Sequence, residues 1–231
     1  MPALQRRIVV AIDGPSGSGK STVSREVARR LGLAYLDTGA MYRAVCWWCL
    51  ERGIDLTDVE AVAQEARRLP LQMGTDPAGP RVLVDGQDVG AAIRESRISR
   101  QVSLVATNLA VRAELVRRQQ EIIAAATAGI VAEGRDITTV VAPDADVRVL
   151  LTADEEARLA RRALELHGHS AQEALAATRD EVLRRDRDDA TVSTFHVAAD
   201  GVVTVDTSTL TLEQAVDAVL QVVADRTGEP R

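Results

Sequence analysis

A glycine-rich loop near the amino terminus has the spacing of a site for nucleotide phosphates. Residues 14–22 read Gly-Pro-Ser-Gly-Ser-Gly-Lys-Ser-Thr and fit the pattern G-x-x-x-x-G-K-[ST]. Its glycines let the backbone turn several N–H groups toward one point, and the helix that follows adds its positive dipole end. Lys20 can then reach β- and γ-phosphate oxygens, and the Ser21 hydroxyl is a natural Mg²⁺ ligand. The alternative, a Gly/Ser-rich surface turn, is the weaker interpretation.

The sequence on both sides of this loop supports the same chemistry. Residues 8–12 are an apolar, β-branched run, as expected of a buried strand. After the loop, Val23, Val27, Ala28 and Leu31 recur at helical spacing. A strand that runs directly into such a loop and then into a helix is the context in which this motif binds phosphate.

Two further polar motifs come directly after predicted strands. Residues 37–43, Asp-Thr-Gly-Ala-Met-Tyr-Arg, leave a short strand at 34–37, and residues 133–136, Glu-Gly-Arg-Asp, end a strand at 130–133. In parallel sheets, ligands bind at the carboxyl ends of the strands. We therefore expect these polar side chains near the phosphate loop, with a solvated surface cluster as the weaker alternative.

Two arginine-rich helices are expected at about 153–167 and 170–187. Their arginines include Arg158, Arg161, Arg162, Arg184, Arg185 and Arg187. Such a helical hairpin between two strands suits a lid that closes over transferring phosphates. The alternative is an ordinary solvated pair of helices with many Arg/Glu pairs.

The order of the predicted elements indicates an α/β fold. Strands are expected at 8–12, 34–37, 130–133, 147–151 and 201–206, and helices at about 19–31, 40–52, 58–69, 95–107, 109–127 and 211–226, besides the two arginine-rich ones. This alternation predicts a parallel sheet covered by helices on both faces. Between residues 70 and 98, short runs around Pro and Gly turns at 71–73, 81–84 and 87–89 predict a small antiparallel β insertion.

Composition limits the classes of function. The chain has 231 residues and a net charge of −6, which argues against a broad nucleic-acid interface. No signal peptide and no apolar run long enough to span a bilayer are visible, so we expect a soluble, cytoplasmic protein without a membrane partner. Lys20 is the only lysine, and the other basic residues are arginines, which suit bidentate phosphate contacts but also reflect genomic bias.

The two cysteines, Cys46 and Cys49, match C-x-x-C. A redox pair normally has its first cysteine at the amino-terminal end of a helix, where the dipole lowers the thiol pKa. Here the pair lies well inside a predicted helix, so core packing is the favoured interpretation. The three histidines form no recognised metal-ligand spacing with them.

Taken together, these motifs resemble those of the bacterial cytidylate kinases, within the nucleoside monophosphate kinase family, along essentially the whole chain. The resemblance rests on residues 13–22, 36–43, 84–89 with Ile93-Arg94, 101–103, 111–112, 133–136 and 185–189. It implies one P-loop NTPase-type kinase unit of 231 residues. Its core would span about 1–39, 128–152 and 196–231, its monophosphate-binding region about 40–127 with the β insertion at about 70–98, and its lid about 153–195.

The resemblance also implies roles for individual residues. ATP and Mg²⁺ would be held by Gly14, Pro15, Ser16, Gly17, Ser18, Gly19, Lys20, Ser21 and Thr22, with Ser21 as the metal ligand. CMP or dCMP would be bound by Thr38, Arg43, Ser103, Arg112, Arg135, Asp136, Arg185 and Asp189. Within that set, Arg43 and Arg135 would grip the acceptor phosphate; Ser103, Arg112 and Asp136 would read the cytosine; and Arg185 with Asp189 would hold the sugar. Lys20, Arg135, Arg158 and Arg162 would act on the transferring group.

The implied reaction is transfer of the γ-phosphoryl group of ATP to CMP or dCMP, by a monomer. The sequence departs from the pattern at Val192, where many relatives carry an arginine that would contact the sugar or phosphate. Two alternatives stay open from the residues alone. One is another acceptor, such as AMP, UMP or shikimate; the other is a regulatory switch that hydrolyses its nucleotide. The absence of an Asn-Lys-x-Asp motif counts against a GTPase.

Overall fold

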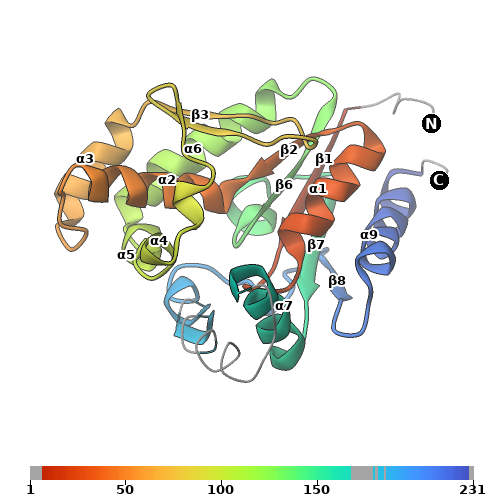
Figure 1. The fold of residues 1–231 in the computed structure, drawn as a ribbon. Coiled ribbons are helices and arrows are strands. Elements are labelled where there is room, and N and C mark those ends of the chain that lie inside the picture. Colours follow the sequence, from red (N-terminus) through yellow and green to blue (C-terminus); the bar gives the residue numbers. More distant parts are fainter. Residues whose placement is uncertain (1–6, 168–178, 180–181, 185, 229–231) are drawn as a thin grey trace.

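A five-stranded parallel sheet forms the centre of the computed structural model, which describes residues 7–167, 179, 182–184 and 186–228. Its strand order is β2-β6-β1-β7-β8 (Figure 1). The strands are β1 (Ile8–Asp13), β2 (Ala34–Asp37), β6 (Gly129–Gly134), β7 (Val147–Thr152) and β8 (Val203–Asp206). All neighbours pair in parallel, so the carboxyl ends of the five strands meet at one edge, as the sequence predicted.

Helices cover both faces of this sheet. On one face lie α1 (Lys20–Leu31) and α9 (Leu212–Thr227), and on the other α2 (Thr38–Glu51) and α6 (Leu109–Ala125). Three further helices, α3 (Val59–Arg68), α4 (Ser96–Ser99) and α5 (Val102–Ala106), pack against α2, and α7 (Glu155–His167) lies beyond the ends of the strands. The central strand shows why two layers form. Ile8, Val10 and Ile12 pack with α1 and α9 on one face, and Val9 and Ala11 pack with α2 and α6 on the other. All five are buried, because successive strand side chains point to opposite faces.

The predicted β insertion is confirmed as a three-stranded antiparallel sheet, in the order β3-β4-β5. Its strands are β3 (Leu71–Met73), β4 (Val82–Val84) and β5 (Gln87–Asp88). Asp85 and Gly86 form a two-residue turn with positive φ angles of 50° and 77°, which suits a tight hairpin. The connection between β3 and β4 also reaches the main sheet, where the Tyr35 N–H of β2 donates to the Thr75 carbonyl at 2.8 Å.

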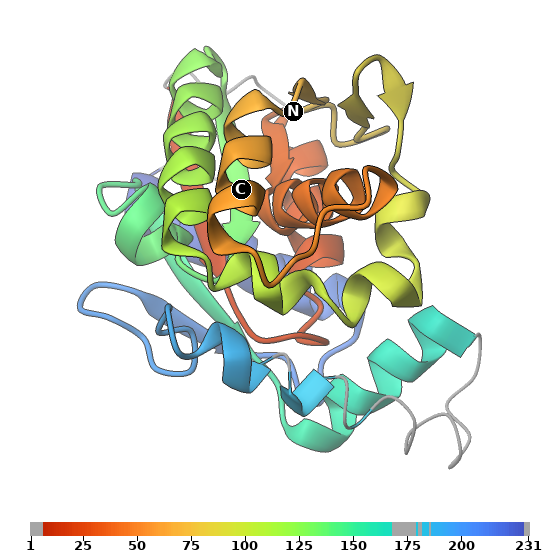
Figure 2. The same ribbon diagram turned by 90° about the vertical axis from the view of Figure 1, so that its left-hand side faces the viewer.

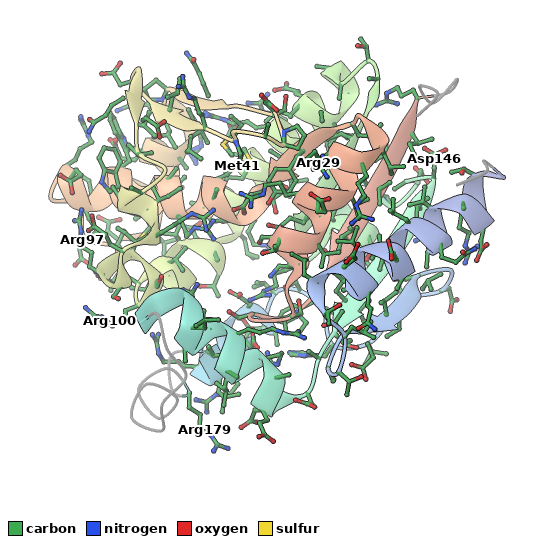
Figure 3. The ribbon with its side chains drawn as sticks, turned by 45° about the vertical axis from the view of Figure 1, so that its right-hand side comes forward. Arg29, Met41, Arg97, Arg100, Asp146 and Arg179 are labelled. Atoms are coloured by element: carbon green, nitrogen blue, oxygen red, sulfur yellow. The ribbon has the colours of Figure 1, made fainter. Side chains whose placement is uncertain are left out.

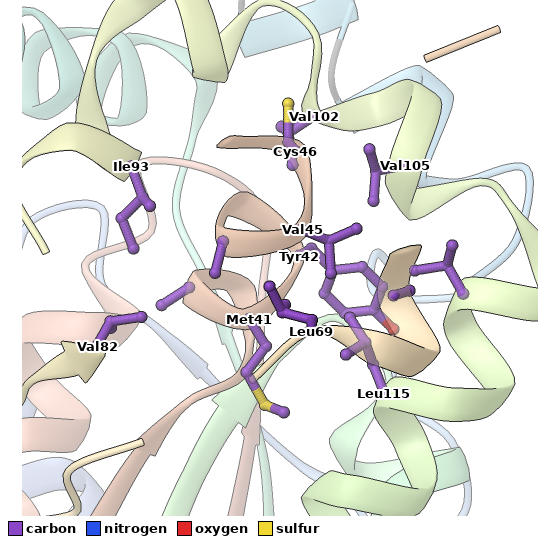
Figure 4. Close-up of a cluster of buried hydrophobic side chains, with 14 of the residues drawn as sticks. Met41, Tyr42, Val45, Cys46, Leu69, Val82, Ile93, Val102, Val105 and Leu115 are labelled. Atoms are coloured by element: carbon purple, nitrogen blue, oxygen red, sulfur yellow. The ribbon is translucent and has the colours of Figure 1, made fainter. Parts of the chain in front are cut away.

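The prediction of one continuous helix at 95–107 was wrong. The chain forms a 3₁₀ turn, η1 (Ala92–Arg94), followed by the short helices α4 and α5. Glu95, whose backbone is extended (φ −60°, ψ 149°), separates η1 from α4. The break inside the predicted helix falls at Arg100 and Gln101, between α4 and α5. These breaks allow Ile93, Val102 and Val105 to reach the same core around α2 (Figure 4). Burial of these three apolar side chains outweighs helical continuity.

The two cysteines belong to this core, as predicted. Cys46 and Cys49 are free thiols with no exposed surface, on the buried side of α2. Burial raises the pKa of Cys46 to about 12 and that of Cys49 to about 11. Both thiols are therefore almost entirely protonated at neutral pH, whereas a reactive dithiol has an ionised thiol.

The arginine-rich region lies across the edge where the strands end. Helix α7 follows β7, and residues 182–184 and 186–189 form helical turns beside it (Figure 2). The predicted helix at 153–167 is thereby confirmed, whereas most of the one predicted at 170–187 lies outside the described residues. No helix in the described part of the chain combines the length and apolarity needed to cross a membrane.

Candidate active site

The phosphate loop joins β1 to α1 and packs tightly against α7. Gly17 has a φ of +77°, and a Cβ atom there would lie 2.5 Å from the carbonyl oxygen of Arg158. Glycine is therefore required both by the left-handed backbone and by the close approach of the two segments. Helix α1 begins at Lys20, so its amino-terminal end faces the space in front of the loop.

A cavity opens between this loop and the ends of β2 and β6. Six basic and four acidic residues line it: Lys20, Arg43, Arg94, Arg112, Arg135 and Arg162, with Asp37, Glu133, Asp136 and Asp189. A second cavity continues from the loop toward α7 and the β8–α9 connection, where Arg161, Leu164, Thr207, Leu210 and Leu212 line it. The two cavities meet at the loop and share Lys20 and Arg162. The wall of the second cavity combines leucines with charged residues such as Arg25 and Arg161.

Glu133 is an important site residue that the sequence interpretation did not assign. It is the fifth residue of β6, and its buried carboxylate accepts a hydrogen bond from the Ser21 hydroxyl at 2.6 Å. The Tyr35 hydroxyl donates to the same oxygen at 3.3 Å. Burial raises the pKa of Glu133, the charge of Asp37 adds to this effect, and Lys20 opposes it. The feature that could have identified Glu133 was its position at the end of a strand, next to the strand that carries the phosphate loop.

The Ser21 hydroxyl and the Glu133 carboxylate together fit a divalent cation. A hydroxyl and a carboxylate next to a phosphate-binding loop are the hard ligands that Mg²⁺ prefers. A second carboxylate, that of Asp37, raises the pKa of Glu133 through like charge, and a bound cation would relieve that repulsion. Among the described residues no group of three or more Asp, Glu, His or Cys side chains forms a ready-made cation cage, so phosphate oxygens would have to complete the coordination.

Asp37 organises the end of β2. One carboxylate oxygen caps α2 by accepting from the Ala40 N–H at 2.8 Å, and the other accepts from Arg43 Nη2 at 2.8 Å. Arg94 Nη2 lies 3.6 Å from that second oxygen. Burial alone would raise the pKa of Asp37, but the two arginines hold it below its ordinary value. The neighbouring Thr38 hydroxyl donates to the Glu133 carbonyl at 2.8 Å and so joins α2 to β6.

Arg112 and Asp136 form a buried ion pair on the wall of the charged cavity. Arg112 Nη2 donates to Asp136 Oδ2 at 2.5 Å, and the side chains are 13% and 6% exposed. Burial raises the pKa of Asp136, and Arg112 acts in the opposite direction. The backbone after Asp136 is fixed by Asp13, whose carboxylate accepts the N–H groups of Ile137 and Thr138 at 2.8 Å each. Residues Ile137–Val141 form a π-helical turn that the sequence did not predict.

Arg135 connects β6 to the segment that follows α7. Its Nε donates to Asp189 at 3.1 Å and its Nη2 donates to Asp186 at 3.0 Å. Its guanidinium lies 4.6 Å above the ring of Phe195, which is fully buried. Its Nη1 donates to the Gly14 carbonyl. A planar cation held by two carboxylates and an aromatic face has a defined orientation.

Asp186 brings the phosphate loop and α7 together, and it too was missed from the sequence. Its buried carboxylate accepts from the Ser16 N–H at 3.1 Å, from Arg135 and from Arg158. Burial would raise its pKa, but Arg135 and Arg158 hold it below the usual value. Nothing in the local pattern distinguishes this aspartate from Asp188, because its role depends on partners that are distant in the sequence.

Helix α7 and the residues after it also contact α4 and the residue that follows it. Arg162 Nη2 donates to the Ser99 hydroxyl at 3.5 Å, and Arg184 Nη2 donates to the Arg100 carbonyl at 3.2 Å. Arg162 lines both cavities. Arg161, which the sequence did not assign, instead donates to the Thr207 hydroxyl at 2.9 Å, at the wall of the second cavity.

The structure brings most predicted site residues to these two cavities. Those that line one or both are Ser16, Gly17, Ser18, Gly19, Lys20, Ser21, Thr22, Thr38, Arg43, Arg112, Arg135, Asp136, Arg162 and Asp189. Gly14, Pro15, Ser103 and Arg158 do not line them, although Arg158 reaches Asp186 and Ser103 is a buried neighbour of the lining residue Val102. Arg185 lies outside the described residues. Ser193 lines the charged cavity, and Val192 does not.

Comparison with known proteins gives consistent matches over nearly the full chain. A family model described as cytidylate kinase matches residues 10–225. Cytidylate kinase of Streptomyces avermitilis is 47% identical over 220 residues, which cover 95% of this chain and 94% of that protein. Cytidylate kinase of Cutibacterium acnes is 51% identical over 220 residues, covering 94% and 96%. Among solved structures, an uncharacterised protein from Eubacterium ventriosum covers 95% of this chain and 100% of its own, with a TM-score of 0.50 at 12% identity, which is a likeness of fold alone.

Proposed function

Because the chain belongs to the cytidylate kinase family, we propose that the charged cavity is its acceptor site and the phosphate loop its donor site. The protein is a cytidylate kinase and phosphorylates CMP or dCMP with ATP. An oxygen of the acceptor phosphate attacks the γ-phosphorus of ATP, the bond to the β–γ bridging oxygen breaks, and ADP leaves. No stronger nucleophile is needed, because the acceptor phosphate is already anionic at neutral pH.

The donor phosphates lie on the loop in this proposal. The N–H groups of residues 17–22 and the amino-terminal end of α1 supply fixed dipoles, and Lys20 adds a positive charge between the two cavities. Ser21 and Glu133 would hold Mg²⁺, which supplies charge neutralisation at the phosphate oxygens when bound. The second cavity, with its leucines and Arg161, suits the base and sugar of the donor.

The acceptor phosphate would lie between Arg43 and Arg135, which enter the charged cavity from α2 and β6. Both guanidiniums are oriented by carboxylates, Arg43 by Asp37 and Arg135 by Asp186 and Asp189. Preorganised arginines are suited to a phosphate because they make two parallel hydrogen bonds with fixed geometry. The position of Thr38 at the start of α2 supports a place beside this phosphate.

The cytosine would be read by Asp136 and Arg112. A carboxylate accepts from the exocyclic amine of cytosine, and a guanidinium donates to its O2 carbonyl. Ser103 would take part only if α5 shifts when the base binds, since its side chain is set back from the cavity wall. Asp189 and Arg185 would hold the sugar.

Closure of the residues from α7 to Asp189 over the loop would exclude water, which otherwise accepts the phosphoryl group and wastes ATP. Arg158 and Arg162 belong to this lid, and Asp186 ties it to the Ser16 N–H. In this proposal the enzyme works as a monomer in the cytoplasm, within pyrimidine nucleotide metabolism.

One observation carries the choice of acceptor: the buried Arg112–Asp136 pair in the same cavity as Lys20 and Arg43. The test is ADP formation from ATP and Mg²⁺ with CMP, dCMP, UMP, AMP or shikimate, together with a sample that contains no acceptor. We expect CMP and dCMP to give the highest kcat/KM. A preference for AMP, UMP or shikimate would refute the base assignment, and equally fast ADP release without acceptor would indicate a nucleotide-hydrolysing switch.

A further inference from the structure

Asp136 lies directly before a helical turn but does not cap it. Its carbonyl accepts the N–H groups of Val140 and Val141 at 2.9 and 3.1 Å, at the start of the π-helical turn Ile137–Val141. The first N–H groups of such a turn have no partner inside it, and an aspartate in this position commonly accepts them. The Asp136 side chain makes no such hydrogen bond and pairs with Arg112 on the cavity wall instead.

The carboxylate of Asp13 caps the turn in its place. It accepts from the N–H groups of Ile137 and Thr138 at 2.8 Å each, and from the Thr138 hydroxyl at 2.6 Å. Three donors therefore converge on one buried carboxylate, since Asp13 is only 2% exposed. Because these two N–H groups already have a strong acceptor, they do not draw the Asp136 carboxylate away from the cavity.

The position of Asp13 in the sheet fixes this contact. Asp13 is the last residue of β1 and pairs in register with Gly134, the last residue of β6. Both backbones are held by the parallel ladder at the point where the carboxylate of one strand reaches the turn that follows the other. The cap is therefore supplied from the strand that also leads into the phosphate loop.

We propose that Asp13 is a positioning residue for base recognition, which caps the turn after Asp136 and so leaves the Asp136 carboxylate available to cytosine. The proposal rests on the assignment of Asp136 to the base in the proposed function. Without the Asp13 carboxylate, the Asp136 side chain would turn toward the N–H groups of its own turn and withdraw from Arg112 and from the base.

The test measures the CMP/UMP ratio of kcat/KM values in Asp13→Asn at saturating ATP, with thermal unfolding as the check on folding. Asparagine keeps the size of the side chain, but its NH₂ faces a donor of the turn, so it cannot accept all three hydrogen bonds. We expect the ratio to fall about tenfold, because the charge-assisted contact of Asp136 to the amine of cytosine is weakened. A purely structural role would lower kcat/KM for both substrates by the same factor, and an unchanged ratio would overturn the proposal.

Two variants of Thr138 test the same cap with less disturbance of the buried carboxylate. Thr138→Val removes the hydroxyl that donates to Asp13 and keeps the backbone N–H, whereas Thr138→Ser keeps both donors. The CMP/UMP ratio should fall in Thr138→Val and keep its wild-type value in Thr138→Ser. Equal ratios in the two variants would contradict the proposal, and this pair decides the matter if Asp13→Asn does not fold.

The matched control is Asp146→Asn, the same change near the start of β1 (Figure 3). Asp146 accepts from the Val9 N–H at 2.9 Å and lines neither cavity, so the CMP/UMP ratio should not change. A fall as large as that in Asp13→Asn would show that the ratio reports only general loosening of the sheet.

A double variant separates the role of Asp13 from that of Asp136. In the Asp136→Asn background, Asp13→Asn should cause no further fall in the CMP/UMP ratio, because Asp13 acts only through Asp136. A further fall would overturn the proposal. An unchanged ratio in Asp136→Asn alone would instead refute the assignment of Asp136 to the base, on which the proposed function rests.

Discussion

Replacement of Asp136 by asparagine tests whether this carboxylate distinguishes cytosine from uracil. The two bases differ at position 4, where cytosine carries an amine donor and uracil a carbonyl acceptor. A carboxylate accepts from the amine and repels the carbonyl oxygen, so it favours CMP and disfavours UMP at once. An asparagine can turn its NH₂ toward uracil instead.

The size of the effect follows from the environment of Asp136. Its carboxylate is 6% exposed, so the hydrogen bond to the base forms with little competition from water. Loss of one charge-assisted hydrogen bond costs about 1.5–3 kcal/mol, which lowers kcat/KM for CMP by about ten- to a hundredfold. The kcat/KM for UMP should stay the same or rise. Arg112 also loses its anionic partner, and since breaking a buried ion pair can cost about 3–5 kcal/mol of stability, the variant must be shown to be folded.

The assay measures kcat/KM for CMP and UMP at saturating ATP, with thermal unfolding as the check on folding. Asp144→Asn is the matched control, because Asp144 is an exposed aspartate that does not line either cavity. If both substrates fall by the same factor, the CMP/UMP ratio is unchanged and Asp136 only orients its neighbours.

For the wild-type enzyme, the pH dependence of the CMP/UMP ratio of kcat/KM values gives an independent check. Burial raises the pKa of Asp136, so its carboxylate takes up a proton at a higher pH than an ordinary aspartate, even with Arg112 beside it. As pH falls through that raised value, the neutral carboxyl can donate to uracil, and the CMP/UMP ratio should decrease. In Asp136→Asn the CMP/UMP ratio should not depend on pH. If the ratio still decreases at low pH in this variant, Asp136 is not the group that reads the base.

Three further outcomes are expected. Lys20→Met should fold and lose about 10²–10³ in kcat, because a preorganised cation at the transferring phosphate contributes on the order of 3–4 kcal/mol; near-normal turnover would show that the loop is not the donor site. Asp186→Asn should lower kcat about tenfold or more while the KM for CMP changes less, because Arg135 loses an orienting partner; a change in KM alone would contradict this. Cys46 and Cys49 should not react with a thiol reagent at about pH 8 in native protein, since burial raises both pKa values, and both should react in denaturant; rapid reaction of the native protein would be inconsistent with the core position.

The parts of the site that could be predicted are those set by local sequence. The loop at 14–22 is recognisable because a tight turn, a helix start and a cation must follow in a fixed order, and the structure places α1 directly after it. The end positions of β2 and β6 could be predicted for a similar reason, because apolar runs followed by polar residues mark where strands of a parallel sheet end.

The parts that could not be predicted depend on contacts between distant segments. Glu133, Asp186 and Asp13 each acquire their role from partners contributed by other elements, such as the Ser21 hydroxyl, the Ser16 N–H and the Thr138 N–H. The division of the helix predicted at 95–107 into α4 and α5 has the same origin. The pattern of apolar residues there fits one helix, but the side chains reach the core around α2 only if the chain turns between the two pieces.

The hydrogen bond from the Tyr35 N–H to the Thr75 carbonyl protects the molecule against self-association at high concentration. β2 is one of the two outer strands of the main sheet, and strands in that position attract other chains through their unpaired N–H and C=O groups. The connection between β3 and β4 covers this side by accepting the Tyr35 N–H at 2.8 Å. A chain shortened by removal of the insertion would expose Ala34-Tyr35-Leu36 along a bare edge, and we expect it to self-associate even if the remaining fold is intact.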